Sequence, residues 1–380
     1  MSLISLPERP RLALLITNSE IGGAQTHVAD LLRALRGQAD VTLLAGGDGP
    51  LFDLAHELGI PAIRLATLDN ALSPVKAVVA LRELMAALRD AAPDLLHTHS
   101  AKASALGRIA GRLLRIPVVY TVHGFAFKPA APWKQRTVAR IAEWVLAPLA
   151  SQVICVSAAE RTMARNLPIA DDRISTIPNG IADVSQRADP AAAMRQVVTV
   201  MRLAPPKRPD ILIRAFAAAN LPDCELVIAG DGPQRGALEA LVGQLAPARV
   251  RFAGNIDNVP ALLAGSQMFL LASDHEGLPI SILEAMRAGL PVIASDLPGI
   301  REQLDDGRCG MLVNDNEPGR FADALRALAA DAPARAAMSQ AARQRWQDTY
   351  GPERMVSATW AVYQRVLACR QHADTRISAS

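Results

Sequence analysis

Short apolar runs alternate with helix-like segments along most of the chain. The runs are nearly continuous in Val, Ile and Leu, which is typical of strands buried on both faces. The predicted strands are Leu12–Thr17, Val41–Ala45, a strand around Leu95–Leu96, Val118–Val122, Val153–Val156, Val197–Val200, Glu225–Ala229, Val250–Phe252, Met268–Leu271 and Val292–Ala294. The helices predicted between them include Ala24–Leu35, Pro74–Arg89, Ala103–Leu114 and Gln234–Leu245. The pattern predicts an α/β fold with parallel sheets covered by helices.

One strand-to-helix joint occurs in both halves of the chain. Val41–Ala45 leads through Gly47-Asp48-Gly49-Pro50, and Glu225–Ala229 leads through Gly230-Asp231-Gly232-Pro233. The repeat predicts two similar doubly wound domains, although a favourable turn used twice would look the same. In such domains ligands bind at the carboxyl ends of the strands, so a site is expected in the cleft between them.

The domain boundary is expected in the polar, then alanine-rich stretch Asp183–Ala193, which follows the turn Ile177-Pro178-Asn179-Gly180. The predicted domains are residues 1–188 and 189–350, and residues 351–380 form a final helix and tail.

Composition narrows the function. The 380 residues include 20% charged residues and carry a net charge of only +3, which does not indicate a general nucleic-acid-binding protein. The four cysteines are far apart and suggest neither a zinc site nor a disulfide framework. Residues 1–8 lack a signal-peptide pattern, and the apolar stretch Ile141–Ala159 is too polar to span a membrane. A cytoplasmic protein is expected.

The most informative residues are two glutamates eight positions apart, Glu276 and Glu284. Pro279 is suited to an early helix position and Gly289 to the helix end, which places Glu276 before the helix and Glu284 in its second turn. Eight residues at helical rise span roughly 12 Å, about the length of a sugar nucleotide. Helix-start N–H groups between the glutamates could bind phosphates. Two surface glutamates without a ligand are the alternative.

Two cations follow the first strand of the second half. Arg202 and Lys207 are suited to clamp a diphosphate, although a solvated basic loop would have the same sequence. No Asp-x-Asp occurs, which argues against an acidic pair holding a divalent metal. No metal is therefore expected.

Glycines and histidines end strands in the first half. Gly22 and Gly23 could let a helix start approach a phosphate, or could form a turn without a ligand. His97, His99 and His123 lie at strand ends. We interpret His97 as a hydrogen-bonded packing residue and His123 as a cleft residue; a metal site is the less favoured alternative.

The segment from Leu95 to Ala142 is strongly basic. It has no acid and eight cations, with Phe125, Phe127 and Trp133 between them: Lys102, Arg108, Arg112, Arg115, Lys128, Lys134, Arg136 and Arg140. An anionic membrane surface or acidic acceptor, RNA, and a merely solvated face all fit this pattern.

In these motifs the chain resembles the retaining GT-B glycosyltransferases that include many capsule, exopolysaccharide and lipopolysaccharide enzymes, a family 4-like group. The resemblance covers nearly the whole chain. Its motifs are Gly22-Gly23-Ala24-Gln25-Thr26-His27, Thr121-Val122-His123-Gly124, Ile177-Pro178-Asn179-Gly180-Ile181, Arg202 with Lys207, Gly230-Asp231-Gly232-Pro233, and Glu276 to Glu284 followed by Ala288-Gly289-Leu290-Pro291-Val292.

The resemblance implies a GT-B fold of two Rossmann-like domains facing across a cleft, with a last helix, Trp346–Cys369, returning to the first domain. It implies that Glu276 and His123 act at the donor sugar, that Glu284 binds the ribose, and that Arg202 and Lys207 stabilise the departing diphosphate. The implied donor pocket also includes Gly22, Gly23, Gly277, Leu278, Pro279, Ile280 and Ser281. Met201 replaces the family's usual glycine, and Ala182 its usual aspartate.

The function expected is metal-independent, retaining transfer of a sugar from a nucleoside-diphosphate sugar to a hydroxyl of a sugar or lipid-linked acceptor. It would serve cell-surface polysaccharide or glycolipid synthesis, with peripheral contact to the inner membrane face. The alternatives are a sugar-nucleotide epimerase on the same fold, a non-catalytic sugar-nucleotide-binding subunit, and an RNA-binding protein.

Overall fold

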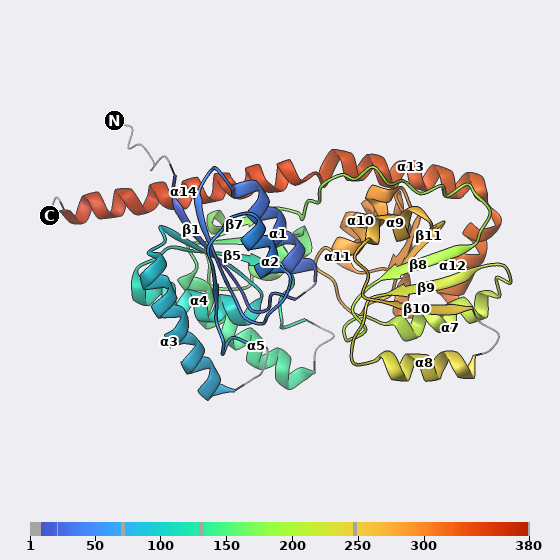
Figure 1. The fold of residues 1–380 in the computed structure, drawn as a ribbon, viewed down its shortest axis with the longest axis horizontal. Helices are drawn as coiled ribbons and strands as arrows, with labels where there is room; N and C mark the ends of the chain where they lie inside the picture. Colours follow the sequence, from blue (N-terminus) through green and yellow to red (C-terminus); the bar gives the residue numbers. More distant parts are fainter. Residues whose placement is uncertain (1–8, 21, 70–72, 129–131, 246–248, 379–380) are drawn as a thin grey trace. The chain divides into compact units, whose positions relative to one another are not determined.

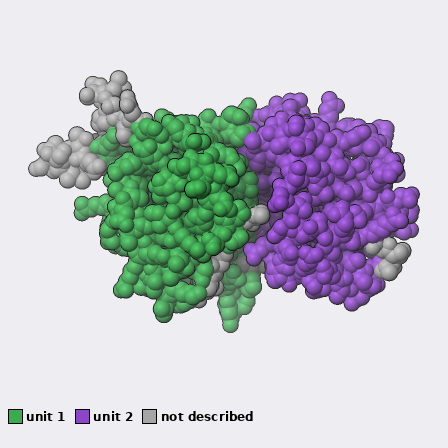
Figure 2. All heavy atoms as spheres, viewed as in Figure 1, with its two compact units in different colours: residues 1–179, 352–380 green, residues 180–351 purple. Residues whose placement is uncertain are grey.

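The computed structural model describes residues 9–20, 22–69, 73–128, 132–245 and 249–378. The stretch 1–8, examined above for a signal peptide, lies outside these residues. The chain forms two compact units, coloured separately in Figure 2. Unit 1 comprises residues 1–179 and 352–380, and unit 2 comprises residues 180–351. The first division falls directly after Asn179, nine residues before the predicted end of the first domain at residue 188 and just before the stretch Asp183–Ala193.

Unit 1 contains a seven-stranded parallel sheet in the order β3-β2-β1-β4-β5-β6-β7 (Figure 1). Its strands are β1 (Arg11–Ile16), β2 (Asp40–Ala45), β3 (Ala62–Arg64), β4 (Leu95–His99), β5 (Val118–Val122), β6 (Gln152–Cys155) and β7 (Ile174–Thr176). Its helices are α1 (Gly23–Leu35), α2 (Leu51–Glu57), α3 (Pro74–Ala91), α4 (Ala101–Leu114), α5 (Trp133–Leu146), α6 (Ala158–Ala164), α14 (Pro352–Ser378) and the short η1 (Ala147–Leu149) and η2 (Asp171–Arg173).

Alternation along β1 separates two hydrophobic cores. Leu12, Leu14 and Ile16 pack with α1, α2 and α14 on one face of the sheet. Ala13 and Leu15 pack with α3 and α4 on the other. Because helices cover both faces of the sheet at β1, the sequence of this strand shows no polar alternation.

Helix α14 belongs to unit 1, as expected for a chain end that returns to the first domain. Its buried residues Met355, Val362 and Tyr363 join the core formed by β1 and α1. The returning helix begins at Pro352, six residues later than predicted, because Trp346 still lies on the preceding helix α13, which ends at Thr349. Proline cannot continue the hydrogen bonding of a helix that precedes it.

Unit 2 contains a six-stranded parallel sheet in the order β10-β9-β8-β11-β12-β13. This is the strand order of the sheet in unit 1 without a counterpart of β7. Its strands are β8 (Gln196–Val200), β9 (Glu225–Ala229), β10 (Val250–Gly254), β11 (Met268–Leu271), β12 (Val292–Ser295) and β13 (Met311–Val313). Its helices are α7 (Pro209–Ala219), α8 (Arg235–Gln244), α9 (Val259–Ala264), α10 (Ile280–Ala288), α11 (Pro298–Gln303), α12 (Pro318–Ala330), α13 (Ala332–Thr349) and the short η3 (Asp305–Gly307) and η4 (Asn314–Asn316).

The repeated Gly-Asp-Gly-Pro joint makes the same kind of backbone contact in both units. A Cβ on Gly49 would lie 2.5 Å from the carbonyl oxygen of Ser19, and one on Gly232 would lie 2.4 Å from that of Leu203. In each unit, therefore, the turn after the second strand supports the loop after the first strand by close backbone contact. The repeat thus reflects two domains of one topology.

Among the described residues, no helix combines the length and the apolar character that crossing a membrane requires.

Candidate functional site

In unit 2 the structure brings two of the predicted site residues into direct contact. Lys207 Nζ donates a hydrogen bond to Glu276 Oε1 over 2.6 Å, and the side chains are only 18% and 12% exposed. An ammonium and a carboxylate at this distance and burial hold each other in one geometry. A cation and an acid suited to a diphosphate and to sugar hydroxyls are therefore adjacent.

Two loops that follow neighbouring strands present this pair. The loop after β8 carries Lys207, and the segment after β11 carries Glu276. Backbone hydrogen bonds join the loops on both sides of the lysine: Asp274 N donates to Pro206 O and Arg208 N donates to Ala272 O, each over 2.9 Å. The loops consequently form one backbone unit at the carboxyl edge of the sheet, where ligands of such folds bind.

The helix after Glu276 presents one open stripe. Helix α10 begins at Ile280 with Pro279 as its N-cap, and it ends at Gly289 with a left-handed φ of 79°. Seven of its nine residues are buried, and the two that are partly exposed are Ser281 and Glu284. Because residues three apart share a helix face, Ser281 and Glu284 point the same way. Glu284 lies in the second turn and Glu276 before the helix, as predicted.

The start of α10 is held rigidly. Gly277, Leu278, Pro279 and Ile280 are buried, and no side chain of the described residues caps the helix. The first N–H groups of a helix have no intrahelical partner, so they are suited to bind an anion. Gly299 at the start of α11 packs against this segment, where a Cβ would lie 1.8 Å from the Gly277 carbonyl oxygen.

Replacing Gly299 with alanine is expected to displace Gly277 and to destabilise unit 2 by about 1–3 kcal/mol, since a methyl group cannot fit against that carbonyl. Thermal unfolding checks this. Gly319→Ala is the matched control, because Gly319 lies on a helix of the same unit with no atom within 4 Å of the new Cβ. Equal melting temperatures for the two variants would contradict the expectation.

Arg202 is exposed on the same loop as Lys207. Met201 before it is buried, and its carbonyl oxygen would lie 2.0 Å from a Cβ on Gly230. Leu203 N donates to Asp231 O over 2.9 Å. The loop therefore packs tightly although methionine replaces the family's glycine.

Sequence reasoning missed two supports of this site. Asn316 Nδ2 donates to Ser273 O over 2.8 Å and to Asp274 Oδ1 over 3.2 Å. Arg208 binds Asp210 and also Asp274, and these partners raise the pKa of its guanidinium. A single Asn forty residues from Glu276 gives no signal in the sequence.

The altered residue after Asn179-Gly180-Ile181 contacts the last turn of α10. The carbonyl of Ala182 accepts a 2.8 Å hydrogen bond from Arg287, and the neighbouring Asp183 binds Arg343 and Arg187. The hydrogen bond from Arg343 lowers the pKa of Asp183 to about 2. This departure from the family pattern thus affects an ion-pair cluster.

In unit 1, four histidines gather where β4 and β5 end. His99 Nδ1 and His123 Nε2 share a hydrogen bond of 3.2 Å, and the ring of His27 lies edge-on to that of His123 with centroids 4.8 Å apart. His123 is partly exposed, whereas His27 and His99 are buried. His123 is thus the outermost member of the cluster.

His97 is a packing residue, as interpreted from the sequence. Its ring nitrogens bind Tyr363 Oη over 2.6 Å and Thr121 Oγ1 over 2.7 Å. It therefore ties the returning helix α14 to two neighbouring strands. His27 was not singled out from the sequence; its Nδ1 binds Oδ1 of the buried Asn179 over 3.0 Å.

Within the described part of the chain, His27, His99 and His123 are the group that could hold a metal ion, with ligand nitrogens within 4.8 Å of one another. The nitrogens of His27 and His99 that remain without partners are both Nε2. Two other nitrogens of the group are already joined, since His99 Nδ1 and His123 Nε2 bind each other.

The paired glycines lie at the start of α1. Gly23 is the first residue of the helix, and Gly22 is its N-cap in an extended conformation. Thr26 N donates to Gly22 O over 2.9 Å, as in a regular first turn. Residue 21 lies outside the described residues. The helix start is therefore formed by residues that expose backbone rather than side chains.

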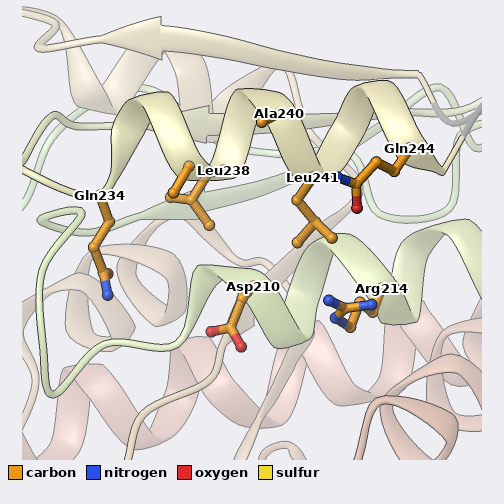
Figure 3. A pocket seen from close by; sticks show the side chains of 8 residues that line it. Asp210, Arg214, Gln234, Leu238, Ala240, Leu241 and Gln244 are labelled. Carbon is orange, nitrogen blue, oxygen red and sulfur yellow. The ribbon is translucent and has the colours of Figure 1, made fainter.

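Unit 2 also contains a pocket of about 320 Å³ between α7 and α8 (Figure 3). It is lined by Asp210, Arg214, Gln234, Ala237, Leu238, Ala240, Leu241 and Gln244. Among the described residues that line it, none is a predicted site residue. The pocket is thus distinct from the Lys207–Glu276 pair.

Comparisons with known proteins agree with this geometry. Residues 21–183 match the description "Glycosyltransferase Family 4", and residues 186–345 match "Glycosyl transferases group 1". An Escherichia coli UDP-Gal:alpha-D-GlcNAc-diphosphoundecaprenol alpha-1,3-galactosyltransferase is 31% identical over 311 residues, which is 76% of this chain and 79% of that enzyme. The chain belongs to the family 4 type of glycosyltransferases.

Further similarities extend over nearly the whole chain. An alpha-maltose-1-phosphate synthase of Mycolicibacterium smegmatis is 29% identical, covering 91% of this chain and 96% of that enzyme. The crystal structure of Anabaena HepE with UDP and glucose superposes with a TM-score of 0.82 at 21% identity, covering 94% of this chain and all of that chain. The fold of this glycosyltransferase is therefore GT-B, as the motifs implied, and the protein is an enzyme.

Proposed function

We propose that this glycosyltransferase transfers a sugar, with retained configuration and without a metal, from a nucleoside-diphosphate sugar to a hydroxyl group of a lipid-linked or saccharide acceptor. The observation that carries the proposal is the contact of Lys207 with Glu276 beside the start of α10. There, one cation, one acid and a helix start lie together. In the proposal the diphosphate binds the cation and the helix start, and the sugar binds the acid.

Charge stabilisation is the chemistry that these residues supply. As the bond between sugar and diphosphate breaks, negative charge grows on the phosphate oxygens. Lys207 and Arg202 would stabilise that charge, and fixed charges are most effective where water is largely excluded. Lys207 meets this condition, since its side chain is 18% exposed.

Glu284 and Ser281 would bind the nucleoside end of the donor, because they form the open stripe of α10 next to its start. A carboxylate accepts hydrogen bonds only, which suits the two hydroxyls of a ribose. Gly22 and Gly23 would approach the phosphates from unit 1, and His123 would orient the donor sugar. Support for a nucleotide sugar also comes from the names of the relatives and of HepE with UDP and glucose.

Metal independence is proposed because cations are available for the diphosphate. Activity after treatment with EDTA is expected to stay within about twofold of the untreated enzyme, since two positive side chains would replace the divalent ion. Initial rates measured with and without EDTA test this. A loss of activity that added zinc or manganese restores would contradict the proposal and would direct attention to His27, His99 and His123.

Configuration and reaction type are tested together. Purified enzyme is incubated with a panel of nucleoside-diphosphate sugars and with lipid-linked and free sugar acceptors, and products are followed by proton NMR. We expect an acceptor-dependent product with the anomeric configuration of the donor. An inverted product would contradict retention.

The same experiment separates the alternatives. An epimerase would convert the donor without any acceptor, and a binding subunit would bind the donor without product. An epimerase needs an acid–base pair at the sugar, whereas the acid seen here, Glu276, is bound to a lysine. This contact favours transfer over epimerisation.

A further inference from the structure

Large apolar side chains are exposed in one region of the described structure. All of those that stand out belong to α3, α4 and α5 of unit 1: Val75, Val78, Val79, Leu113, Trp133, Val138, Ile141, Trp144 and Val145. Helix α5 alone carries five of them, including both tryptophans. Exposed tryptophans and aliphatic residues gathered on one element indicate an interaction surface.

Helix α5 exposes its large apolar side chains and buries a charged one. Its one buried side chain is Glu143, which forms a 2.8 Å ion pair with the buried Arg108 of α4. Its five large apolar side chains are 57–68% exposed. A surface helix normally buries its apolar residues and exposes its charges. Here the core-facing contact is an ion pair and the solvent-facing side is apolar, so packing within unit 1 does not explain the sequence.

The apolar residues form one stripe. At 100° per residue, Trp133, Trp144, Ile141, Val145 and Val138 fall within an arc of about 140°, and Glu143 lies on the opposite side. We call this stripe the outer face of α5. Lys134 lies within the arc, Arg140 lies about 20° outside its Trp133 edge, and Arg136 lies about 60° outside that edge. The long basic side chains can therefore reach the surface that the stripe contacts.

The charge of this face is positive. Lys134, Arg136 and Arg140 are exposed, and the carboxylate of the helix, Glu143, is buried with Arg108. Arg108 itself, counted above in the basic segment, does not belong to the surface, and Lys102 pairs with Asp69. On the neighbouring helix α4, which packs against α5 (Figure 1), Arg112 is exposed, and so is the C-cap residue Arg115. The face lacks the acidic residues that would repel an anionic surface.

We propose that the outer face of α5 docks on an anionic lipid bilayer, with Trp133, Ile141 and Trp144 inserted at the level of the headgroups. Tryptophan prefers this interfacial layer, and arginine and lysine at its edge bind lipid phosphates. The inference rests on the proposed function, because an enzyme that uses a lipid-linked acceptor must work at a membrane surface. Docking of this kind holds the enzyme at the bilayer surface without a spanning helix.

The test measures flotation of the full chain with vesicles. Wild type is expected to bind vesicles of phosphatidylglycerol and phosphatidylcholine at least tenfold better than vesicles of phosphatidylcholine alone, and binding should fall as salt is added. The double variant Trp133→Ser/Trp144→Ser and the charge reversal Arg136→Glu/Arg140→Glu should each lower binding to the anionic vesicles about tenfold or more.

Matched controls exist on the same chain. Val75→Ser/Val78→Ser removes exposed apolar residues from α3, and Arg249→Glu/Arg354→Glu reverses two exposed arginines elsewhere. Both should bind like wild type. Vesicles with brominated acyl chains provide a readout without any substitution, because they should quench the exposed Trp133 and Trp144 and not Trp346, which is buried. Transfer to a free sugar acceptor, measured in parallel, should be retained in the α5 variants.

Vesicle binding that the two α5 variants leave unchanged, or no quenching in wild type, would overturn the proposal. So would wild type that ignores vesicles but self-associates or binds RNA through this face. Failure of sugar transfer with intact vesicle binding would count instead against the proposed function, so the two results can be told apart.

Discussion

Replacing Lys207 with alanine is expected to lower the rate of sugar transfer about 10²- to 10³-fold, which is the usual effect of removing one fixed stabiliser of developing charge. The fall should appear mainly in kcat and less in KM, because the charge on the departing diphosphate is larger in the transition state than in the bound donor. Initial rates over a range of donor concentrations measure both constants.

Arg320→Ala is the matched control for this prediction. It removes an arginine from an exposed ion pair with Glu317 on α12 of the same unit, and transfer should stay near wild type. Thermal unfolding of both variants checks that unit 2 remains folded. Near-normal turnover in Lys207→Ala would remove the lysine from the catalytic site.

Glu276→Ala is expected to have an effect of similar size, and the double variant should lose less than the product of the two single effects. The reason is their direct contact of 2.6 Å, since residues that touch are not independent. A double variant with fully multiplicative losses would mean that the two side chains act separately.

Acid is expected to destabilise unit 1 steeply, and this is the second large effect. His27, His97 and His99 are buried, and burial lowers the pKa of His27 to about 4 and those of His97 and His99 well below the usual 6.5. The unfolded chain takes up protons at these groups below about pH 6.5, and the folded chain does not. Their contribution to stability is therefore complete above about pH 6.5 and is lost as pH falls toward about 4.

The steepness of the loss in stability follows from the number of protons that the unfolded chain takes up and the folded chain does not. Three histidines that stay neutral in the folded state remove up to about 4 kcal/mol per unit of pH from the free energy of unfolding. Urea unfolding followed by circular dichroism at neutral pH and near pH 5 measures the slope. His27→Gln should reduce the slope by about one proton. The exposed His56 on α2 offers the control variant His56→Gln. A flat profile for wild type would contradict the account of the cluster.

Much of the fold could be predicted because its inner strands are uninterrupted apolar runs. Every strand predicted from such a run is present, with ends shifted by a residue or two. The strands that were missed are β3, β7 and β13, each three residues long and at the edge of a sheet. Three residues leave no pattern to read, and an edge strand needs less apolar sequence.

The site could be predicted only where its residues are close in sequence. The spacing of Glu276 and Glu284 located them relative to one helix, since a local element fixes their geometry. The contact between Lys207 and Glu276 joins residues 69 apart, and Gly299 and Asn316 come from other strand ends. Such contacts depend on strand order, which periodicity does not reveal. The ion pair of Arg108 with Glu143 was missed for the same reason, so a buried arginine was counted as surface charge.

The central claim is that unit 2 binds the diphosphate of a nucleotide sugar through Lys207 and the start of α10. A crystal structure of the enzyme with a nucleoside-diphosphate sugar tests it most directly. The account predicts phosphate oxygens within hydrogen-bond distance of Lys207 Nζ and the first N–H groups of α10, sugar hydroxyls on Glu276 and ribose hydroxyls on Glu284. A ligand bound in the pocket between α7 and α8, with the Lys207–Glu276 pair untouched, would contradict it.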